Sequence, residues 1–269
     1  MNELVDFIDL KDRWREKFDH IYCISYAPYQ NRRKLLIPEL KRTGILDSGI
    51  FSFHYTINNY LDDILLNSSN FNREMNNPRF NKAALNLAIG HYSVMKESLQ
   101  LGYKKILILE DDVVFRKNLD EVIPIIKPND DVDIVLYDWV GIESQKNFFD
   151  ISYGKLKKYY QNTGYGQYDK NLILWGTSCY AVNDKAMQYI TFNQEQKFNV
   201  ADYYTNSFTF FGDNLAKDPL VRFFAYKHIA IQRPNRQTIS NHGINGWVYQ
   251  QNGLSDFGTI DIKDYNIEL

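Results

Sequence analysis

Cysteine is scarce in this chain of 269 residues, which has only Cys23 and Cys179. Each lies in an apolar, strand-like run, and the sequence has no paired spacing typical of a zinc site or a disulfide framework. We expect two buried thiols, because a free cysteine behaves as a small hydrophobic side chain. This cysteine usage fits a reducing cytoplasm.

Long apolar runs are missing as well. No stretch approaches the roughly 18 residues that a membrane-spanning helix needs. The first six residues, Met1–Asp6, are acidic and lack the basic start and apolar core of a signal peptide. These absences predict a cytoplasmic protein.

The chain has no strong excess of charge of either sign. Its formal net charge is -2, so no long-range positive field would attract nucleic acid or anionic lipid. Hydrophobic residues make up 44% and charged residues 24% of the sequence, as in an ordinary globular protein. Repeats, low-complexity tracts and Pro/Gly/Ser-rich linkers are also absent, which favours one domain over residues 1–269.

Strand and helix patterns alternate along the chain, which predicts an α/β fold with a mostly parallel sheet. The clearest helix has apolar residues spaced by 3.6 positions; Asn81 can cap its start and Gly102 ends it. Other helices are expected from about residue 32 to 43 and from about residue 184. Strands are expected at residues 20–25, 50–57, 106–109, 132–137, 172–182 and 221–226. The polar stretch 143–170 is long for a plain connection and is typical of a binding loop.

Three adjacent carboxylates, Glu110-Asp111-Asp112, directly follow the apolar strand at 106–109. Ligands of open α/β sheets bind at the carboxyl ends of strands. Because the three charges repel one another, a hard divalent cation such as magnesium or manganese would be favoured there. Along an extended chain, Glu110 and Asp112 share one side while Asp111 can hydrogen-bond into the fold. The pattern predicts a metal site that holds a nucleoside diphosphate; a solvated acidic turn is the alternative.

The stretch from Ala83 to Val113 resembles glycosyltransferase family 25, the lipooligosaccharide-type galactosyltransferases and their collagen-modifying relatives. That family has a helix with a small-residue-Ser-His signature, matched here by Gly90-His91, and a strand that ends in Glu-Asp-Asp. Residues 21–33, 176–182, 200–202 and 231–240 are similar to further segments of the family. The sequence departs from the family pattern at Gly90, where Ser is usual, and at residues 25–28.

The resemblance implies the GT-A fold, a Rossmann-like α/β/α sandwich. Its nucleotide-sugar half would span about residues 18–140 and its acceptor-side half about residues 141–269. It further implies a UDP-sugar donor, commonly UDP-galactose, a divalent metal (Mn or Mg), and an inverting transfer of a hexose to an oligosaccharide or glycolipid acceptor in lipooligosaccharide or lipopolysaccharide synthesis. A glycolipid acceptor would bring the protein to the cytoplasmic face of the inner membrane, and no nucleic acid partner is expected.

Candidate site residues fall into three groups. Metal ligands are expected to be Glu110 and Asp112, with His242 or His228 completing the shell. Asp202 is the candidate base that takes the proton of the acceptor hydroxyl, with Asp213 second. Contacts to the donor are expected from Arg32, Arg33, His91, Asp111, Gly176, Thr177, Gln232 and Arg233. Purely structural roles are the alternatives: a solvated first helical turn for the arginines, a satisfied histidine for His91, a packing glycine for Gly176 and a cap residue for Asp202.

Two other functions fit the same features. A metal-dependent sugar nucleotidyltransferase can have this fold and a metal at the same strand end, although the N-terminal region lacks a Gly-rich phosphate loop. A non-catalytic carbohydrate- or nucleotide-binding protein would keep the fold without turnover, although the intact Glu110-Asp111-Asp112 argues against it.

Overall fold

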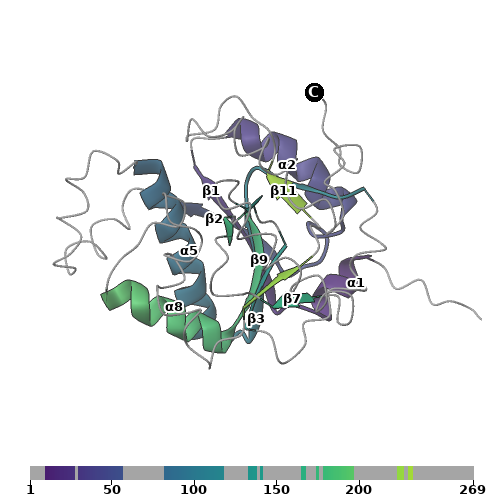
Figure 1. Ribbon diagram of the computed structural model, residues 1–269. Coiled ribbons are helices and arrows are strands. Elements are labelled where there is room, and N and C mark those ends of the chain that lie inside the picture. The colour runs from purple at the N-terminus through teal and green to yellow at the C-terminus, as the bar shows by residue number, and fades with distance from the viewer. Residues whose placement is uncertain are drawn as a thin grey trace, which may run out of the picture.

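The computed structural model describes residues 10–27, 30–56, 82–117, 133–137, 140–141, 165–167, 174–175, 178–196, 223–226 and 230–232. Within these ranges a seven-stranded sheet has the order β2-β1-β3-β9-β5-β10-β7 (Figure 1). Its strands are β1 (His20–Tyr26), β2 (Phe51–Thr56), β3 (Lys105–Glu110), β5 (Ile134–Leu136), β7 (Tyr165–Gln167), β9 (Cys179–Asn183) and β10 (Phe223–Tyr226). Two small sheets pair β4 (Val113–Phe115) with β11 (Ala230–Gln232), and β6 (Val140–Gly141) with β8 (Leu174–Trp175).

Most strands of the large sheet run in one direction. Strand β1 pairs in parallel with β2 and β3, and β5 pairs in parallel with β10. Strand β9 is antiparallel to both β3 and β5, so β3 and β5 share a direction. Strand β7 is antiparallel to β10. The predicted α/β class with a mostly parallel sheet is confirmed.

Helices cover both faces of the sheet (Figure 1). On one side lie α1 (Leu10–Arg15) and α2 (Gln30–Arg42), and on the other lie α5 (Lys82–Leu101) and α8 (Asp184–Gln196). The core beneath α2 contains Leu36 and Leu40 of the helix together with Cys23 and Leu107 of the sheet. These side chains are all buried, and burial of apolar area of this kind is the main stabilising contribution to such a layer.

Helix α5 lies unusually close to the sheet at Gly90. A Cβ atom added to Gly90 would lie 2.6 Å from Cγ2 of Ile24 and 2.7 Å from Cγ2 of Thr56. Real Cβ atoms essentially never come that close to another heavy atom. The missing side chain at Gly90 therefore sets how deeply α5 packs onto β1 and β2.

The predicted helix boundaries agree closely with the structure. Helix α2 begins two residues before the expected position 32 and ends one residue before position 43. Helix α5 ends at Leu101, and Gly102 follows with a φ of 77°, the left-handed conformation that glycine adopts readily. Helix α8 begins at Asp184, where Oδ1 of Asn183 accepts a hydrogen bond from the Ala186 amide at 2.9 Å and caps the first turn. The proposed cap Asn81 lies outside the described residues.

The single strand expected at residues 172–182 is wrong. Leu174–Trp175 pairs with β6 in a small sheet, whereas Cys179–Asn183 inserts between β3 and β5 in the large one. The sequence does not show that the chain passes from one sheet to another here, because Leu174–Trp175 and Cys179–Asn183 both consist mainly of apolar residues. Within the expected binding loop at 143–170, residues 165–167 form β7 and the rest lies outside the described residues.

Both cysteines are buried free thiols, as predicted. Burial raises the pKa of Cys23 well above its usual value, with a further contribution from the charges of Asp111 and Asp112. In the part of the chain that the structure describes, no helix has the length and apolar character needed to cross a membrane. The proposed division into halves at about residue 140 stays a prediction.

Candidate active site

The acidic cluster lies at the carboxyl edge of the sheet, beside the end of β1. Strands β1 and β3 are parallel neighbours, and Ile24 is the Cα partner of Glu110. Ser25 therefore stands next to the turn that Asp111 and Asp112 form immediately after β3. All three carboxylates are buried: Glu110 is 8% exposed, Asp111 5% and Asp112 4%. A solvated acidic turn is excluded by this burial.

Asp111 is tied into the fold through both of its oxygens. Ser25 Oγ donates to Oδ2 at 2.7 Å, and Arg32 Nη1 donates to Oδ1 at 2.9 Å. Hydrogen bonds to a charged partner are stronger than neutral ones, contributing roughly 1.5–3 kcal/mol each. Asp111 thus links the ends of β1 and β3 to the first turn of α2.

Asp112 shares the guanidinium of Arg32 with Asp111. Nη1 of Arg32 lies 3.4 Å from Oδ2 of Asp112. Burial by itself lowers the pKa of Arg32, but the charges of Asp112 and Asp111 outweigh it and raise that pKa above its usual value. The expectation that Asp112 points to the same side as Glu110 assumed an extended chain, whereas β3 ends at Glu110 and a turn follows.

Arg33 folds back onto the end of β1. Its Nη1 donates to Oγ of Ser25 and to the carbonyl of Tyr26, both at 3.0 Å, and its Nη2 donates to the carbonyl of Ala27 at 2.7 Å. The guanidinium carbon also lies 5.1 Å from the centre of the Tyr55 ring. Arg33 therefore shapes the backbone that borders the acidic turn, and its predicted contact with a donor stays a prediction.

Glu110 faces the opposite layer, where it meets His91. Nε2 of His91 lies 3.4 Å from Oε1 of Glu110, and Nδ1 lies 2.9 Å from the hydroxyl of Tyr180. The His91 ring has no exposed surface, and burial lowers its pKa to about 3. Burial also raises the pKa of Tyr180 well above its usual value. His91 is a neutral side chain at physiological pH.

Two later segments of the chain also reach the acidic cluster. The amide of Glu110 donates to the carbonyl of Ser178 at 2.9 Å, which brings the residue after Gly176-Thr177 to the end of β3. Strand β11 is antiparallel to β4, and Gln232 is the Cα partner of Val113. The backbone of Gln232, a predicted donor contact, therefore lies opposite the residue that follows Asp112.

Sequence analysis missed two residues of this network, Ser25 and Tyr180. Ser25 lies in the segment that departs from the family pattern, and its position at the end of an apolar strand before Arg32 and Arg33 was the only local signal. Tyr180 lies inside a predicted strand, where a buried aromatic is unremarkable. The other predicted site residues, Gly176, Thr177, Asp202, Asp213, His228, Arg233 and His242, lie outside the described residues.

Of the predicted metal ligands, Glu110 and Asp112 lie within the described residues. Over the described ranges, no three or more His, Cys, Asp or Glu side chains are grouped so that they could hold a metal ion. Glu110 and Asp112 nevertheless offer carboxylate oxygens, the ligands that magnesium and manganese prefer. Such ions are commonly held by one or two protein carboxylates together with phosphate oxygens of the substrate. Both carboxylates stay predicted ligands of an ion that arrives with a nucleotide.

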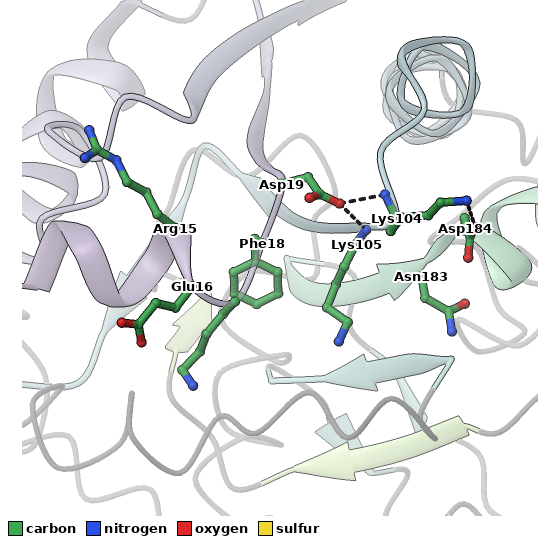
Figure 2. Close-up of a pocket in the computed structure, with 9 residues that line it drawn as sticks. Arg15, Glu16, Phe18, Asp19, Lys104, Lys105, Asn183 and Asp184 are labelled. Atoms are coloured by element: carbon green, nitrogen blue, oxygen red, sulfur yellow. Dashed lines mark hydrogen bonds and ion pairs between the residues drawn. The ribbon is translucent and has the colours of Figure 1, made fainter.

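A polar pocket of about 290 Å³ lies elsewhere, at the opposite edge of the sheet (Figure 2). Asp19 accepts hydrogen bonds there from the amides of Lys104 and Lys105, at 2.6 and 2.8 Å. The Lys104 ammonium pairs with Asp184 at 2.7 Å, and this interaction raises the pKa of Lys104. The contacts of Asp19 hold the start of β3 against the start of β1, and the pair of Lys104 with Asp184 holds it against the start of α8. The pocket has no part in the acidic cluster.

Comparison with known proteins identifies the family of this chain. Residues 18–205 match the profile of a family described as Glycosyltransferase family 25 (LPS biosynthesis protein), and the chain belongs to this family. It is therefore a glycosyltransferase. A search of the curated proteins found no match.

Among solved structures, the chain is similar to one described as the crystal structure of a glycosyltransferase involved in the glycosylation of the major capsid of PBCV-1. The two are 10% identical, with a TM-score of 0.40, and the match covers 79% of this chain and 94% of the other.

Proposed function

We propose that this glycosyltransferase moves a hexose, galactose in the first instance, from a UDP-sugar to a saccharide acceptor in lipooligosaccharide or lipopolysaccharide synthesis. We further propose that the transfer depends on a divalent metal and inverts the anomeric centre. The observation that supports this best is the buried cluster of Glu110, Asp111 and Asp112 at the carboxyl edge of β3. One guanidinium, that of Arg32, contacts two of these carboxylates. A divalent cation would stabilise the remaining negative charge.

The residues of the cluster have different tasks in this proposal. Glu110 and Asp112 hold the metal, with His242 or His228 as a further ligand. When bound, the metal neutralises charge that develops on the nucleoside diphosphate as it leaves. Asp111 is occupied by Ser25 and Arg32, so its task is to keep the turn in place. Because the turn is held on both sides, the carboxylates of Glu110 and Asp112 need not move when charge develops on the leaving group. This is electrostatic preorganisation.

The remaining steps fall to segments around the cluster. The pairing of Gln232 with Val113 supports a role for Gln232 and the adjacent Arg233 at the diphosphate. The contact between Ser178 and Glu110 supports Gly176 and Thr177 as neighbours of the donor sugar. Asp202, with Asp213 as the second candidate, would take the proton from the acceptor hydroxyl.

A donor screen tests this proposal. The purified protein is incubated with UDP-galactose, UDP-glucose or UDP-N-acetylglucosamine, with manganese, magnesium or chelator, and UDP release is measured in the presence of saccharide acceptors. We expect metal-dependent release of UDP, fastest with UDP-galactose. Release of pyrophosphate from a nucleoside triphosphate and a sugar phosphate, without UDP release from any UDP-sugar, would favour a nucleotidyltransferase instead.

A further inference from the structure

We propose that His91 and Tyr180 are positioning residues for Glu110, joined in a directed series of polar contacts (the Tyr180–His91–Glu110 series) that runs from the Tyr180 hydroxyl through the His91 ring to the Glu110 carboxylate. The consequence for catalysis rests on the proposed function, in which Glu110 holds the metal of the donor. The Tyr180–His91–Glu110 series itself does not depend on that function, because it is present in the folded protein.

Three separate elements of secondary structure supply the side chains of the Tyr180–His91–Glu110 series. Tyr180 lies on β9, His91 on α5 and Glu110 at the end of β3. Tyr180 is the Cα partner of Ile108, so its side chain is on the same face of the sheet as those of Ile108 and Glu110. Helix α5 covers that face and places His91 between the two side chains. The distances are 2.9 Å from Tyr180 Oη to Nδ1 and 3.4 Å from Nε2 to Glu110 Oε1.

The chemistry of the three groups determines which group donates and which accepts at each contact of the Tyr180–His91–Glu110 series. A carboxylate can only accept hydrogen bonds, and a neutral imidazole has one N–H group and one acceptor nitrogen. We therefore assign the proton to Nε2, the nitrogen that faces Glu110. Nδ1 is then the acceptor, and the hydroxyl of Tyr180 donates to it. At 3.4 Å the contact to Glu110 does not meet hydrogen-bond geometry, so it is a weaker electrostatic contact that leaves the oxygens of Glu110 available to a stronger partner.

Burial makes this arrangement rigid. His91 and Tyr180 have no exposed surface, and Glu110 is 8% exposed. At the neighbouring Gly90 a Cβ atom would lie 2.6 Å from Ile24 and 2.7 Å from Thr56, so this part of α5 is packed closely against β1 and β2. A ring without exposed surface does not contact a donor in this conformation. We therefore assign His91 a positioning role in place of the donor contact that the sequence suggested.

A matched pair of substitutions separates this role from simple core packing. The amide nitrogen of Gln reaches the place of Nε2, whereas the shorter Asn reaches only the place of Nδ1. His91→Gln keeps a donor toward Glu110 but has no acceptor for Tyr180, so it should lose less metal affinity than His91→Asn. His91→Asn should weaken metal affinity by about tenfold, the lower end of the effect seen when a group behind a metal ligand is removed, and Tyr180→Phe should weaken it to the same extent as His91→Gln. Manganese is titrated into each protein with UDP present, and thermal unfolding reports whether each variant folds.

Equal losses in His91→Gln and His91→Asn, with both variants folded, would overturn the proposal, because packing alone would then explain the effect. Unchanged affinity in Tyr180→Phe and His91→Asn would overturn it too.

A spectroscopic arm does not depend on the proposed function. The chain has five histidines, so the ring signals of the ¹⁵N-histidine-labelled protein can be assigned by the loss of one set in His91→Gln. At neutral pH we expect His91 to show a protonated Nε2 and an unprotonated Nδ1. A protonated Nδ1 would overturn the proposal, because Nδ1 could then not accept a hydrogen bond from Tyr180. If the wild type has the expected tautomer but binds no UDP with manganese, the proposed function is wrong, whereas the Tyr180–His91–Glu110 series is supported.

Discussion

The hydroxyl of Ser25 donates to Oδ2 of Asp111 at 2.7 Å, joining two buried residues that are 86 positions apart in the chain. The same hydroxyl oxygen accepts a hydrogen bond from Arg33 Nη1 at 3.0 Å. Ser25 therefore connects the end of β1 both to the acidic turn and to the first turn of α2. A buried hydroxyl in this position stabilises the fold and the geometry of the cluster together.

Removal of this hydroxyl should affect both stability and ligand binding. Ser25→Ala leaves Asp111 and Arg33 each without one buried partner, so we expect the free energy of unfolding to fall by about 2 kcal/mol. Metal-dependent UDP binding should weaken as well, because the turn that includes Asp112 loses one of its anchors. Urea unfolding and calorimetry measure the two effects.

Ser52→Ala is the matched control. Ser52 lies on the neighbouring strand β2, and its hydroxyl is 2.8 Å from Nε2 of His20, near the other edge of the sheet. This variant should leave UDP binding unchanged. If both variants weaken binding equally, the link from Ser25 to the acidic turn does not have the role described.

A side chain at Gly90 should disturb the packing of α5. Gly→Ala inside a helix ordinarily stabilises it by up to about 1 kcal/mol. At this position the new Cβ would lie within 2.7 Å of methyl groups of Ile24 and Thr56, and such overpacking costs roughly 1–3 kcal/mol. We expect Gly90→Ala to destabilise the protein, as measured by chemical denaturation.

Gln100→Ala, on the exposed side of the same helix, should change stability by less than about 0.5 kcal/mol. The close approach at Gly90 would be contradicted by a Gly90→Ala protein that is as stable as the wild type or more so. Gly90→Ser, which introduces the residue usual in the family, should destabilise for the same reason.

The buried His91 should make stability depend on pH. Burial lowers its pKa from the ordinary 6.5 to about 3 in the folded protein. Between these two values the unfolded chain binds a proton that the folded chain does not. The contribution of His91 is thus fully present above pH 6.5 and is lost as the pH falls toward 3, by up to about 1.4 kcal/mol per pH unit.

Denaturation curves of the wild type and His91→Gln between pH 6.5 and 5 measure this slope. His20 and His54 also have lowered pKa values, in each case mainly through burial, and both remain in His91→Gln, where only the smaller contribution of His91 to the lowered pKa of His54 is lost. The wild type should therefore lose stability more steeply than His91→Gln. Parallel curves would show that His91 does not have the lowered pKa.

Asp112→Asn should abolish transfer while leaving the fold intact. The amide has nearly the shape of the carboxylate but lacks the charge that would hold the metal. Asp184→Asn is a matched substitution at the opposite edge of the sheet, where the side chain of Asp184 contacts the Lys104 ammonium and the Lys185 amide. That variant should retain full turnover. Transfer by Asp112→Asn at the wild-type rate would remove Asp112 from the metal site.

Local patterns in the sequence were sufficient for the elements that make the site. An uninterrupted apolar run predicted β3, and three carboxylates after it predicted a ligand-binding edge. The 3.6-residue periodicity and Gly102 defined α5 almost to the residue. Each of these features depends on residues that are close together in the sequence, so one sequence is enough to predict it.

Contacts between distant segments could not be predicted in the same way. Ser25 and Asp111 are 86 residues apart, and His91 and Tyr180 are 89 apart. Their pairing depends on strand order, on the antiparallel insertion of β9 and on the depth to which Gly90 lets α5 pack. The expectation that Asp112 and Glu110 share one side assumed an extended chain, whereas a turn follows Glu110 and Asp112 lies near Arg32.

The central claim is that Glu110 and Asp112 hold a metal that binds a nucleotide. Calorimetric titration of UDP into the wild type and Asp112→Ala, each with manganese and with chelator, tests it most directly. We predict binding to the wild type only when manganese is present, and no detectable binding to Asp112→Ala. Binding of UDP that is equally tight with chelator, or that survives in a folded Asp112→Ala protein, would contradict the claim.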